Sequence, residues 1–514
     1  MAWSSDFKAA LTSQSIAPTY RLMIWRPFAN TIGQNLVIYS DRGDIRIGRS
    51  GPNISGTSVI PSRWSVSFGG FDLDLVGDLS AVRDELTKGA LGLLQCAFIG
   101  LSGFETISIG QVKSISGFAG RYRVVFDDFV SALQSRLDTR YDTTLEYNKW
   151  FFSTVHFSTV THNWSVGATS LQVNSTANYE RQSASIDGVI YCIPQHGGDP
   201  FYMRWNAATS TTLTLTTGTA SHPSTTTASD LKVGDRVYNA VRITSAPWSF
   251  FARLMTSTGT GSNGPFDELP ANWTAGAPIP IAMFDYADAE TTQSYIKPAT
   301  GSFYQVDYVQ NQPLQGGFRD ILNQFNQVGM WVSMKENSFT WRGANDPTGQ
   351  YHTPIPVSAS ITDEDIIGID RVEMYDTTLS APYMRITQVY DLNGNQQSYL
   401  NTVSRSLPTT GEIERTGALL YSGGGGNRAS MAQGDIFRMR IWDQNHCTKI
   451  VLRLPLRFAG LCAGDAVQIK SSYLVDMSTD VGRTYNNRRG MVLAISYNIS
   501  ERMVSLTIGL PPLL

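Results

Sequence analysis

The feature that most constrains the fold is the alternation of apolar and polar residues in short runs separated by glycines. Around the Gly69-Gly70 pair, apolar residues recur at every second position. They are Trp64, Val66 and Phe68 before the glycines, and Phe71, Leu73 and Leu75 after them. A period of two is typical of strands with one buried face. Similar runs recur along the chain, and together with 45 glycines they predict a mainly β protein with a few helices, of the α+β class.

Three segments have helical spacing instead. A helix is expected over Phe129–Leu137, capped by Asp127 or Asp128, where it would close the first β region. Another is expected from Pro247 to Met255, because proline suits the first helical position. The stretch "GFRDILNQFNQVG" predicts a third, amphipathic helix that stops at Gly329.

Turn signals predict hairpins and strand starts. "MWVSMKENSFTWRG" is expected to turn at Glu336-Asn337, and "VYDLNGNQQSYL" at Asn393-Gly394, a dipeptide that favours a type I′ turn. Gly-Asp precedes an alternating strand at positions 234–235, 434–435 and 464–465. There glycine can adopt a positive φ while aspartate caps the turn. No long repeat is visible in the sequence.

The length of 514 residues exceeds what one core accommodates, so several domains are expected. The expected boundaries follow the changes in pattern. Residues 1–145 are predicted to form a β-barrel or sandwich with its closing helix, and 146–245 an inserted all-β module. Residues 246–345 are predicted to form an α+β region, and 346–514 a second strand-rich domain.

Charge and cysteine content exclude several classes of protein. A net charge of −3 provides no basic surface for tight nucleic-acid binding. Cys96, Cys192, Cys447 and Cys462 stand far apart, which favours buried thiols over a disulfide framework or a zinc site. The N-terminal "MAWSSDFKAAL" has no secretory pattern, so Sec export is not expected. The apolar segment Ala90–Phe104 is too short to span a bilayer and predicts a buried strand pair.

One motif resembles a nucleotide-binding loop. Gly259, Gly261 and Gly264 have the G-x-G-x-x-G spacing, but a helix is expected before them and prolines follow. The phosphate-binding version needs a strand before the glycines and a helix after them. We therefore expect a structural loop and no cofactor.

Few residues are candidates for a chemical site. His156 and His162 would share one face of a strand, with His196 as a third metal ligand, but solvent-facing histidines are favoured and no metal is expected. The acidic run Asp363–Asp365 could supply a glycosidase carboxylate, although after Thr362 it more often caps a turn. The spacing of Asp391, Asn393 and Asn395 is close to that of a calcium loop, but the hairpin is favoured. No catalytic residue is assigned.

Three segments carry a resemblance to a known family. They are "SIGQVKSISGFAGRYRVVFDDFVSALQSRL" from Ser108, "PWSFFARLMTSTGTGSNGPFDELPANW" from Pro247, and the end of the chain from "PLRFAGLCAGDAVQIKSSYLVD" to "RRGMVLAISYNISERMVSLTIGL". In this order they resemble the central hub, or tail-tip, proteins of long-tailed, siphovirus-like bacteriophages. The likeness spans most of the chain.

The resemblance implies a structural role without catalytic residues. It implies two tube-type β-barrel hub domains in each chain and a homotrimeric ring that continues the tail tube and matches a hexameric ring above it. The implied location is the distal end of the virion tail, after synthesis in the host cytoplasm. The implied neighbours are the distal tail protein, tail-tip and tail-fibre proteins and the tape-measure protein. DNA would pass through the lumen without specific binding, and no stable membrane insertion is implied. The strands from Met491 to Leu510 would form the inner or inter-subunit sheet, with Val492, Ala494 and Ser496 on one face. The implied functions of the protein are host attachment and DNA ejection.

Two alternatives remain. A tail-associated enzyme acting on glycan or cell wall would use the acidic run or the histidines in a deep cleft. A receptor-binding carbohydrate module would expose the aromatic residues Phe201, Tyr202 and Trp205.

Overall fold

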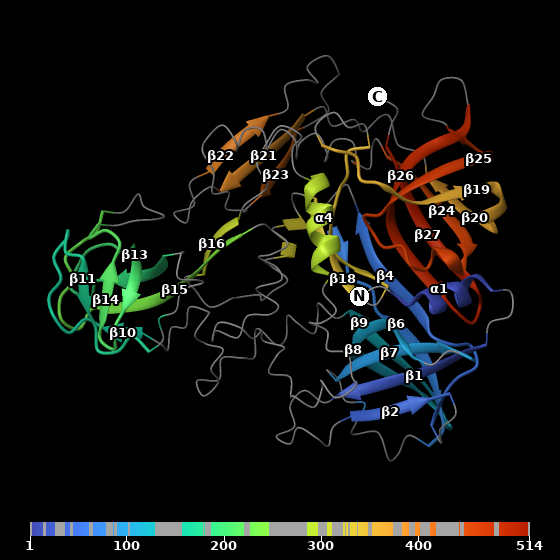
Figure 1. The fold of residues 1–514 in the computed structure, drawn as a ribbon, viewed down its shortest axis with the longest axis horizontal. Helices are drawn as coiled ribbons and strands as arrows, with labels where there is room; N and C mark the ends of the chain where they lie inside the picture. Colours follow the sequence, from blue (N-terminus) through green and yellow to red (C-terminus); the bar gives the residue numbers. More distant parts are fainter. Residues whose placement is uncertain are drawn as a thin grey trace.

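The computed structural model describes most of the chain, and Figure 1 shows its arrangement. The described residues are 3–13, 17–25, 36–41, 45–60, 65–78, 86, 90–100, 103–128, 157–177, 179, 187–219, 227–245, 285–296, 306–310, 322–323, 325–326, 329–336, 338–347, 352–373, 383–389, 396–400, 412–417, 442, 447–476 and 483–511. Within these ranges no helix has the length and apolarity needed to cross a membrane.

The chain is mainly β with a few helices, as predicted. The first region contains α1 (Ser5–Thr12), β1 (Pro18–Trp25), β2 (Leu36–Ser40), β3 (Arg46–Ile47), β4 (Asn53–Ile60), β5 (Ser65–Ser67), β6 (Phe71–Val76), β7 (Leu91–Phe98), β8 (Glu105–Phe118) and β9 (Arg121–Asp128). The last region contains β19 (Val357–Thr362), the 3₁₀ turn η3 (Asp363–Asp365), β20 (Gly368–Glu373), β24 (Thr448–Pro455), the 3₁₀ turn η5 (Leu456–Phe458), β25 (Ala466–Asp476), β26 (Arg483–Asn498) and β27 (Met503–Leu510).

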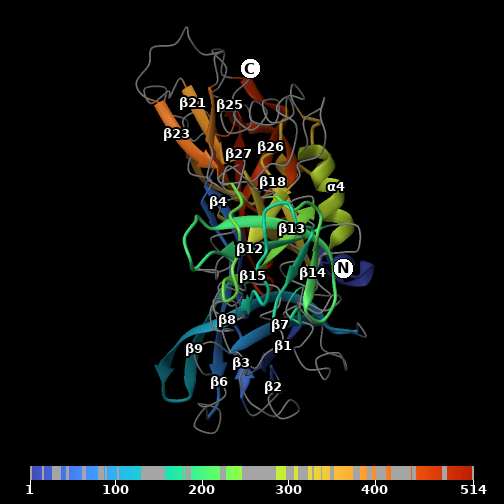
Figure 2. The same cartoon turned by 90° about the vertical axis from the view of Figure 1, so that its left-hand side faces the viewer.

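These two regions share one 15-stranded sheet. Its longest path is β2-β1-β7-β8-β9-β6-β4-β26-β27-β24-β20, and β19 joins it through β25. In Figures 1 and 2 the first strands, in blue, lie below the last strands, in red, and β4 runs between them. One hydrophobic core runs through both, since it contains Leu22 and Phe126 as well as Leu452 and Leu506. Residues from the two ends of the chain are therefore folded against each other.

Strands between residues 157 and 245 form a separate sheet, seen at one side of Figure 1. They are β10 (Phe157–Thr159), β11 (Ser170–Gln172), β12 (Gly188–Ile193), β13 (Phe201–Ala208), β14 (Thr212–Leu215) and β15 (Arg236–Ser245). Their order is β10-β15-β12-β13-β14-β11, and a bridge between Val160 and Val173 brings β11 back beside β10. The path thus closes around its own core, which includes Trp164, Phe201 and Leu213.

The second half of β15 leaves this small barrel and pairs with β16 (Val306–Gln310). Nearby lie α4 (Tyr286–Ile296), β17 (Met330–Lys335) and β18 (Ser338–Gly343). A three-stranded sheet of β21 (Tyr383–Val389), β22 (Gln396–Leu400) and β23 (Glu412–Gly417) completes the described elements.

Several local predictions are confirmed. Phe71, Leu73 and Leu75 are all buried on one face of β6. The hairpin of β17 and β18 turns where expected, with Glu336 at a φ of 56°. Leu322 and Phe325 are helical and buried, and Gly329 follows with a φ of 73°.

Other predictions need correction. The apolar segment from Ala90 forms a single buried strand, β7, because the chain turns at Ile99, which is 71% exposed. In β26 a bulge after Val492 changes the face that is buried, so Ile495 is buried while Ser496 is exposed. The predicted helices at 129–137 and 247–255 and the turn at 393–394 lie outside the described residues, although β21 and β22 pair antiparallel on either side of that turn.

Candidate assembly site: a junction between two repeated units

The large sheet contains the same five-stranded unit twice. In the first repeat, β6 to β9 lie in the order β7-β8-β9-β6, and β4 lies beside β6. In the second repeat, β24 to β27 lie in the order β25-β26-β27-β24, and β20 lies beside β24. Each unit therefore has three consecutive hairpin-connected strands, an earlier strand that returns beside the third, and an outer strand.

The two repeats also agree in pairing register. Four antiparallel residue pairs of the first repeat each have a counterpart in the second. Gly92–Gly110 corresponds to Val467–Gly490, Val112–Phe126 to Val492–Ile508, Phe71–Phe126 to Ile450–Ile508, and Ile54–Phe71 to Val372–Ile450. Both repeats have a bulge at the same place in their longest strand, at Lys113 and at Leu493. A bulge displaces the pairing of two strands by one residue. Because β8 and β26 have their bulges at the same position of the same pairing pattern, the two strands are structurally equivalent.

The expectation that the chain has no long repeat is therefore wrong. The sequence does contain a short signal of it: "GQVKSIS" at 110–116 and "GMVLAIS" at 490–496 have Gly, Val, Ile and Ser in the same places. These are the equivalent segments of β8 and β26 around the bulge. The rest of each unit differs enough in sequence that only the strand order and register identify it.

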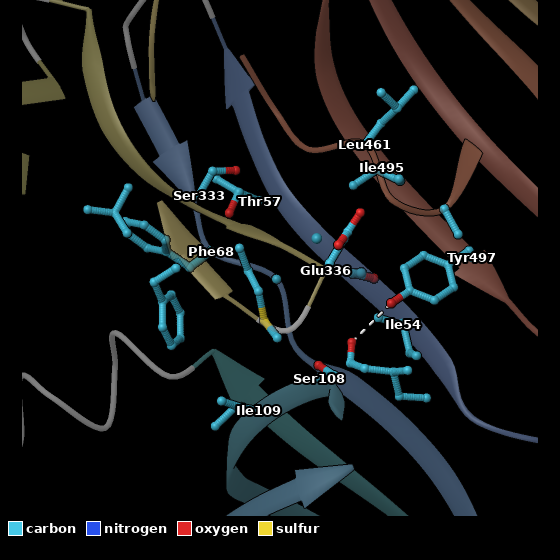
Figure 3. Close-up of a pocket in the computed structure, with 18 residues that line it drawn as sticks. Ile54, Thr57, Phe68, Ser108, Ile109, Ser333, Glu336, Leu461, Ile495 and Tyr497 are labelled. Carbon is cyan, nitrogen blue, oxygen red and sulfur yellow. Dashed lines mark hydrogen bonds between the residues drawn. The ribbon is translucent and has the colours of Figure 1, made fainter. Parts of the chain in front are cut away.

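The repeats meet where β4 of the first pairs with β26 of the second. Gly56 allows the close approach, because a Cβ there would lie 2.5 Å from the Cγ2 of Ile495. The Tyr497 hydroxyl donates to the carbonyl of Ile107 at 3.0 Å, as Figure 3 shows. Burial raises the pKa of Tyr497, so this hydroxyl remains a donor. Polar contacts and close packing thus fix one repeat on the other.

A small cavity lies at this junction (Figure 3). Its lining includes Ile54, Ile495 and Tyr497 together with Glu336 of the β17–β18 turn. Its volume is about 40 Å³. Organic ligands occupy pockets of roughly 300–1,000 Å³, so this space suits one or two waters rather than a substrate.

Helix α1 reinforces the junction from the outside. The Trp3 amide donates to Glu336 at 2.7 Å, and Lys8 forms an ion pair with the same carboxylate at 2.7 Å. The Trp3 indole donates to the carbonyl of Thr106, next to β8 residues that line the cavity. An open hollow of about 450 Å³ lies alongside, between α1, β19 and η5. Its charged lining residues are all engaged in ion pairs: Lys8 with Glu336, Lys335 with Asp465, and Arg457 with Asp365.

A buried ionic cluster fixes α4 and the β17–β18 hairpin to the second repeat. The Arg342 side chain is only 3% exposed and forms ion pairs with Asp465 at 3.2 Å and Asp288 at 2.6 Å. Lys335 lies 3.6 Å from Asp465. Burial by itself would raise the pKa of Asp288, but Arg342, together with Thr340 and Lys335, outweighs this effect and holds that pKa below its usual range. The cluster is a structural connection, because its charges are satisfied by each other.

The Gly-Asp turns that precede strands are confirmed at two of the three positions. Gly234 and Gly464 have φ of 97° and 101°. In each turn the aspartate accepts the amide three residues earlier, Asp235 from Lys232 at 2.7 Å and Asp465 from Cys462 at 3.0 Å. The third turn, at 434–435, lies outside the described residues.

The described residues that were candidates for a chemical site lie at the surface or make contacts that stabilise turns. His162 is exposed beside Thr161, and His196 contacts Asp235 at 2.9 Å. Asp365 caps the turn at Thr362, whose amide donates to it at 2.9 Å, as the capping interpretation predicts. Among the described residues no group of His, Cys, Asp and Glu is arranged to hold a metal ion. All four cysteines are buried and unbridged.

The aromatic candidates for carbohydrate binding are not exposed, so the alternative of a carbohydrate-binding module lacks the exposed aromatics that would support it. Trp205 is 3% exposed and Phe201 is fully buried, because both point into the core of the small barrel. Tyr202 points to the other face of β13, where the ring of Tyr191 covers it at 4.7 Å. His156, the glycines at 259, 261 and 264 and the residues at 391, 393 and 395 lie outside the described residues.

No family model matches the chain, and no curated protein sequence does. Among solved structures, it is similar to a tail protein from Neisseria meningitidis MC58, with 9% identity over 95% of this chain and 96% of that one and a TM-score of 0.37. It is also similar to the 43 kDa tail protein of prophage MuSo2 from Shewanella oneidensis, with 8% identity over 96% and 98% and a TM-score of 0.34. A chain of the native gene transfer agent virion has 13% identity over 69% and 84% and a TM-score of 0.30.

These structural neighbours are phage tail and virion proteins, the class that the three sequence segments resemble.

Proposed function

We propose that the chain is a structural hub protein of a phage tail tip or baseplate, which continues the tail tube and anchors tip or fibre proteins for host attachment and DNA ejection. The observation on which this depends is the internal repeat. A chain with two equivalent β units gives six units around an axis when three copies form a ring. That arrangement matches the symmetry of a hexameric tube ring with only three chains.

In this proposal the two repeats are the two tube-type domains of the hub. The small barrel of residues 157–240 lies to one side of them in Figure 1. Its position suits a surface that contacts fibre or tip proteins. The net charge of −3 suits a lumen through which DNA passes without being held. The other neighbours would be the distal tail protein above and the tape-measure protein inside.

Within the part of the chain that the structure describes, no observation favours an enzyme or a carbohydrate-binding module. Asp365 of the acidic run is 3% exposed and caps a turn, and the three aromatic candidates are buried. The proposed role is therefore structural, at the distal end of the virion tail.

A density map of the assembled tail tip tests the proposal. We expect three copies of this chain around the lumen, with the two repeats of each copy at alternating positions of a six-unit ring. Six copies in one ring, or copies only on peripheral fibres, would contradict it.

A further inference from the structure

Among the strand edges of the large sheet that have no partner in the described residues, which include those of β2 and β19, two belong to corresponding places in the repeats. β8 pairs with β7 as far as Gln111, and the Val112 amide donates to the carbonyl of Ala90 at 2.8 Å, so on that side no described residue pairs with Lys113 to Phe118. β20 pairs with β24 on one side, and no described strand pairs with its other edge. Open edges with apolar side chains are sites for strand pairing between chains.

The internal repeat shows what covers the first edge. In the second repeat, the segment of β26 equivalent to the open part of β8 is covered by β4. There Ile495, which lies under β4, is 4% exposed. The equivalent residue of β8 is Ile115, since Ile115 pairs with Val124 as Ile495 pairs with Leu506. Ile115 is 39% exposed, because no described strand lies over it.

The comparison of the two repeats also explains the open edge of β20. β4 and β20 are the equivalent outer strands, and Ile54 of β4 corresponds to Val372 of β20. Ile54 is 3% exposed between β6 and β26, whereas Val372 is 45% exposed. Ile369 of β20 is also exposed, although it pairs with the buried core residue Leu452. The chain makes this contact once, between β4 and β26. The corresponding edge of β8 in the first repeat and the corresponding strand β20 in the second repeat are not used for it within the chain.

We propose that the end of β20, Arg371–Glu373, in one copy pairs antiparallel with Ser116–Phe118 of β8 in a second copy, and so repeats between chains the β4–β26 contact within the chain. This rests on the proposed ring. Ile115 and Val372 would be buried in the interface, as Ile495 and Ile54 are within one chain. Where Ser55 lies opposite Ser496 in the internal contact, Glu373 of one copy would lie opposite Ser116 of the next.

The contact is head-to-tail, because the two edges differ. Each copy offers one β20 and one open β8, so contacts continue from copy to copy until a ring closes. Three copies would give six contacts between repeats, alternately within and between chains. Closure covers both of these edges in every copy, which is one way to protect open strands from aggregation.

Cysteine cross-linking of the full-length chain tests this register. Directly opposite residues on antiparallel strands have Cα atoms about 4.5–5.5 Å apart, within the range that a disulfide can bridge. Mixing the single variants E373C and S116C under mild oxidation should give a covalent dimer. The chain with both substitutions should give covalent species that end at a trimer. The native cysteines are all buried and do not compete.

Three controls complete the experiment. The variant S55C/S496C should form an internal bridge, since it has the same register within one chain. A mixture of E373C and R121C should give no dimer, because Arg121 lies on β9, whose side of the β8–β9 hairpin is away from the open edge. Adding I115K should reduce the E373C–S116C dimer at least tenfold, while leaving the internal S55C/S496C bridge unchanged.

The outcomes separate the two proposals. Absence of the E373C–S116C dimer while S55C/S496C oxidises overturns the edge pairing. A trimer by mass photometry without this cross-link also overturns the pairing but leaves the ring. Specific cross-links that extend past three copies support the pairing and contradict the trimeric hub.

Discussion

Replacing Arg342 with methionine should strongly destabilise the chain, although this residue lies in no proposed interface. Methionine has similar length and keeps the packing, so the change removes mainly the charge and its hydrogen bonds. It leaves Asp465, whose side chain is 4% exposed, without its nearest cationic partner. Removing one partner of a buried ion pair costs about 3–5 kcal/mol, mostly because the other charge stays buried. Lys335 lies 3.6 Å from Asp465 and would compensate in part, so the lower end is expected.

Urea denaturation followed by tryptophan fluorescence is a suitable assay. Trp331 and Trp341 are fully buried in the strands of this hairpin and report on its environment. The surface pair Arg121–Asp74 provides the control, since the Arg121 side chain is 70% exposed. R121M should cost about 0–1 kcal/mol, as exposed ion pairs do.

A double-mutant cycle then tests the cause. Asparagine at position 465 still accepts the amide of Cys462 but has no charge to bury. R342M/D465N should therefore recover about half or more of the stability that R342M loses, which is a coupling of roughly 1.5–2.5 kcal/mol. Equal costs for R342M and R121M, or additive effects in the cycle, would refute the argument that a buried uncompensated charge dominates.

Three further perturbations test other parts of the argument. Y497F should cost about 1–3 kcal/mol by leaving a buried carbonyl unpaired at the junction, and a cost under 0.5 kcal/mol in the same denaturation assay would show that the contact is dispensable. G464A should lower the melting temperature more than G100A, because both glycines have a φ near 100° but only at position 464 would a Cβ meet Arg342, at 2.8 Å; equal shifts would mean that backbone strain alone decides. Because the folded pKa of Asp288 is lowered, its contribution to stability is present above its unfolded pKa of about 3.9 and is lost as the pH falls through the folded value. Unfolding titrations from pH 6 to pH 2 should show this loss, and D288N should reduce the slope below pH 4; an unchanged slope would assign the acid sensitivity to other carboxyl groups.

The sequence predicts strands well where burial is one-sided. In β6 the alternation of Phe71, Leu73 and Leu75 with aspartates follows directly from one buried and one exposed face. The sequence does not reveal the environment of β13, because both faces of the first half of that strand are covered. There Phe201 and Trp205 point into the barrel core while Tyr202 packs on Tyr191, so aromatic residues that resemble a binding platform are interior packing.

The candidate site was less accessible to sequence reasoning than the strands. The equivalence of the two repeats depends on pairing register, which the hydrophobic pattern alone does not reveal at a bulge such as that at Leu493. The same bulge explains why the predicted face of β26 was wrong. Of the two expected roles for β26 and β27, the inter-subunit sheet is not supported, because β4, β24 and β25 of the same chain pair with them, and the inner sheet stays a prediction. Only strand order and pairing register identify β20 and β8 as corresponding open edges of the two repeats.

The strand β15 gives the projecting barrel a particular mechanical property. Its first half belongs to that barrel, and its second half, Val241 to Ser245, pairs antiparallel with β16. A pull on the barrel along this strand would load the hydrogen bonds of the β15–β16 ribbon together, in shear, whereas a sideways pull would open them one after another. The attachment should therefore resist traction in one direction far more than in the other. A force-spectroscopy measurement that pulls along and then across β15 would reveal this anisotropy.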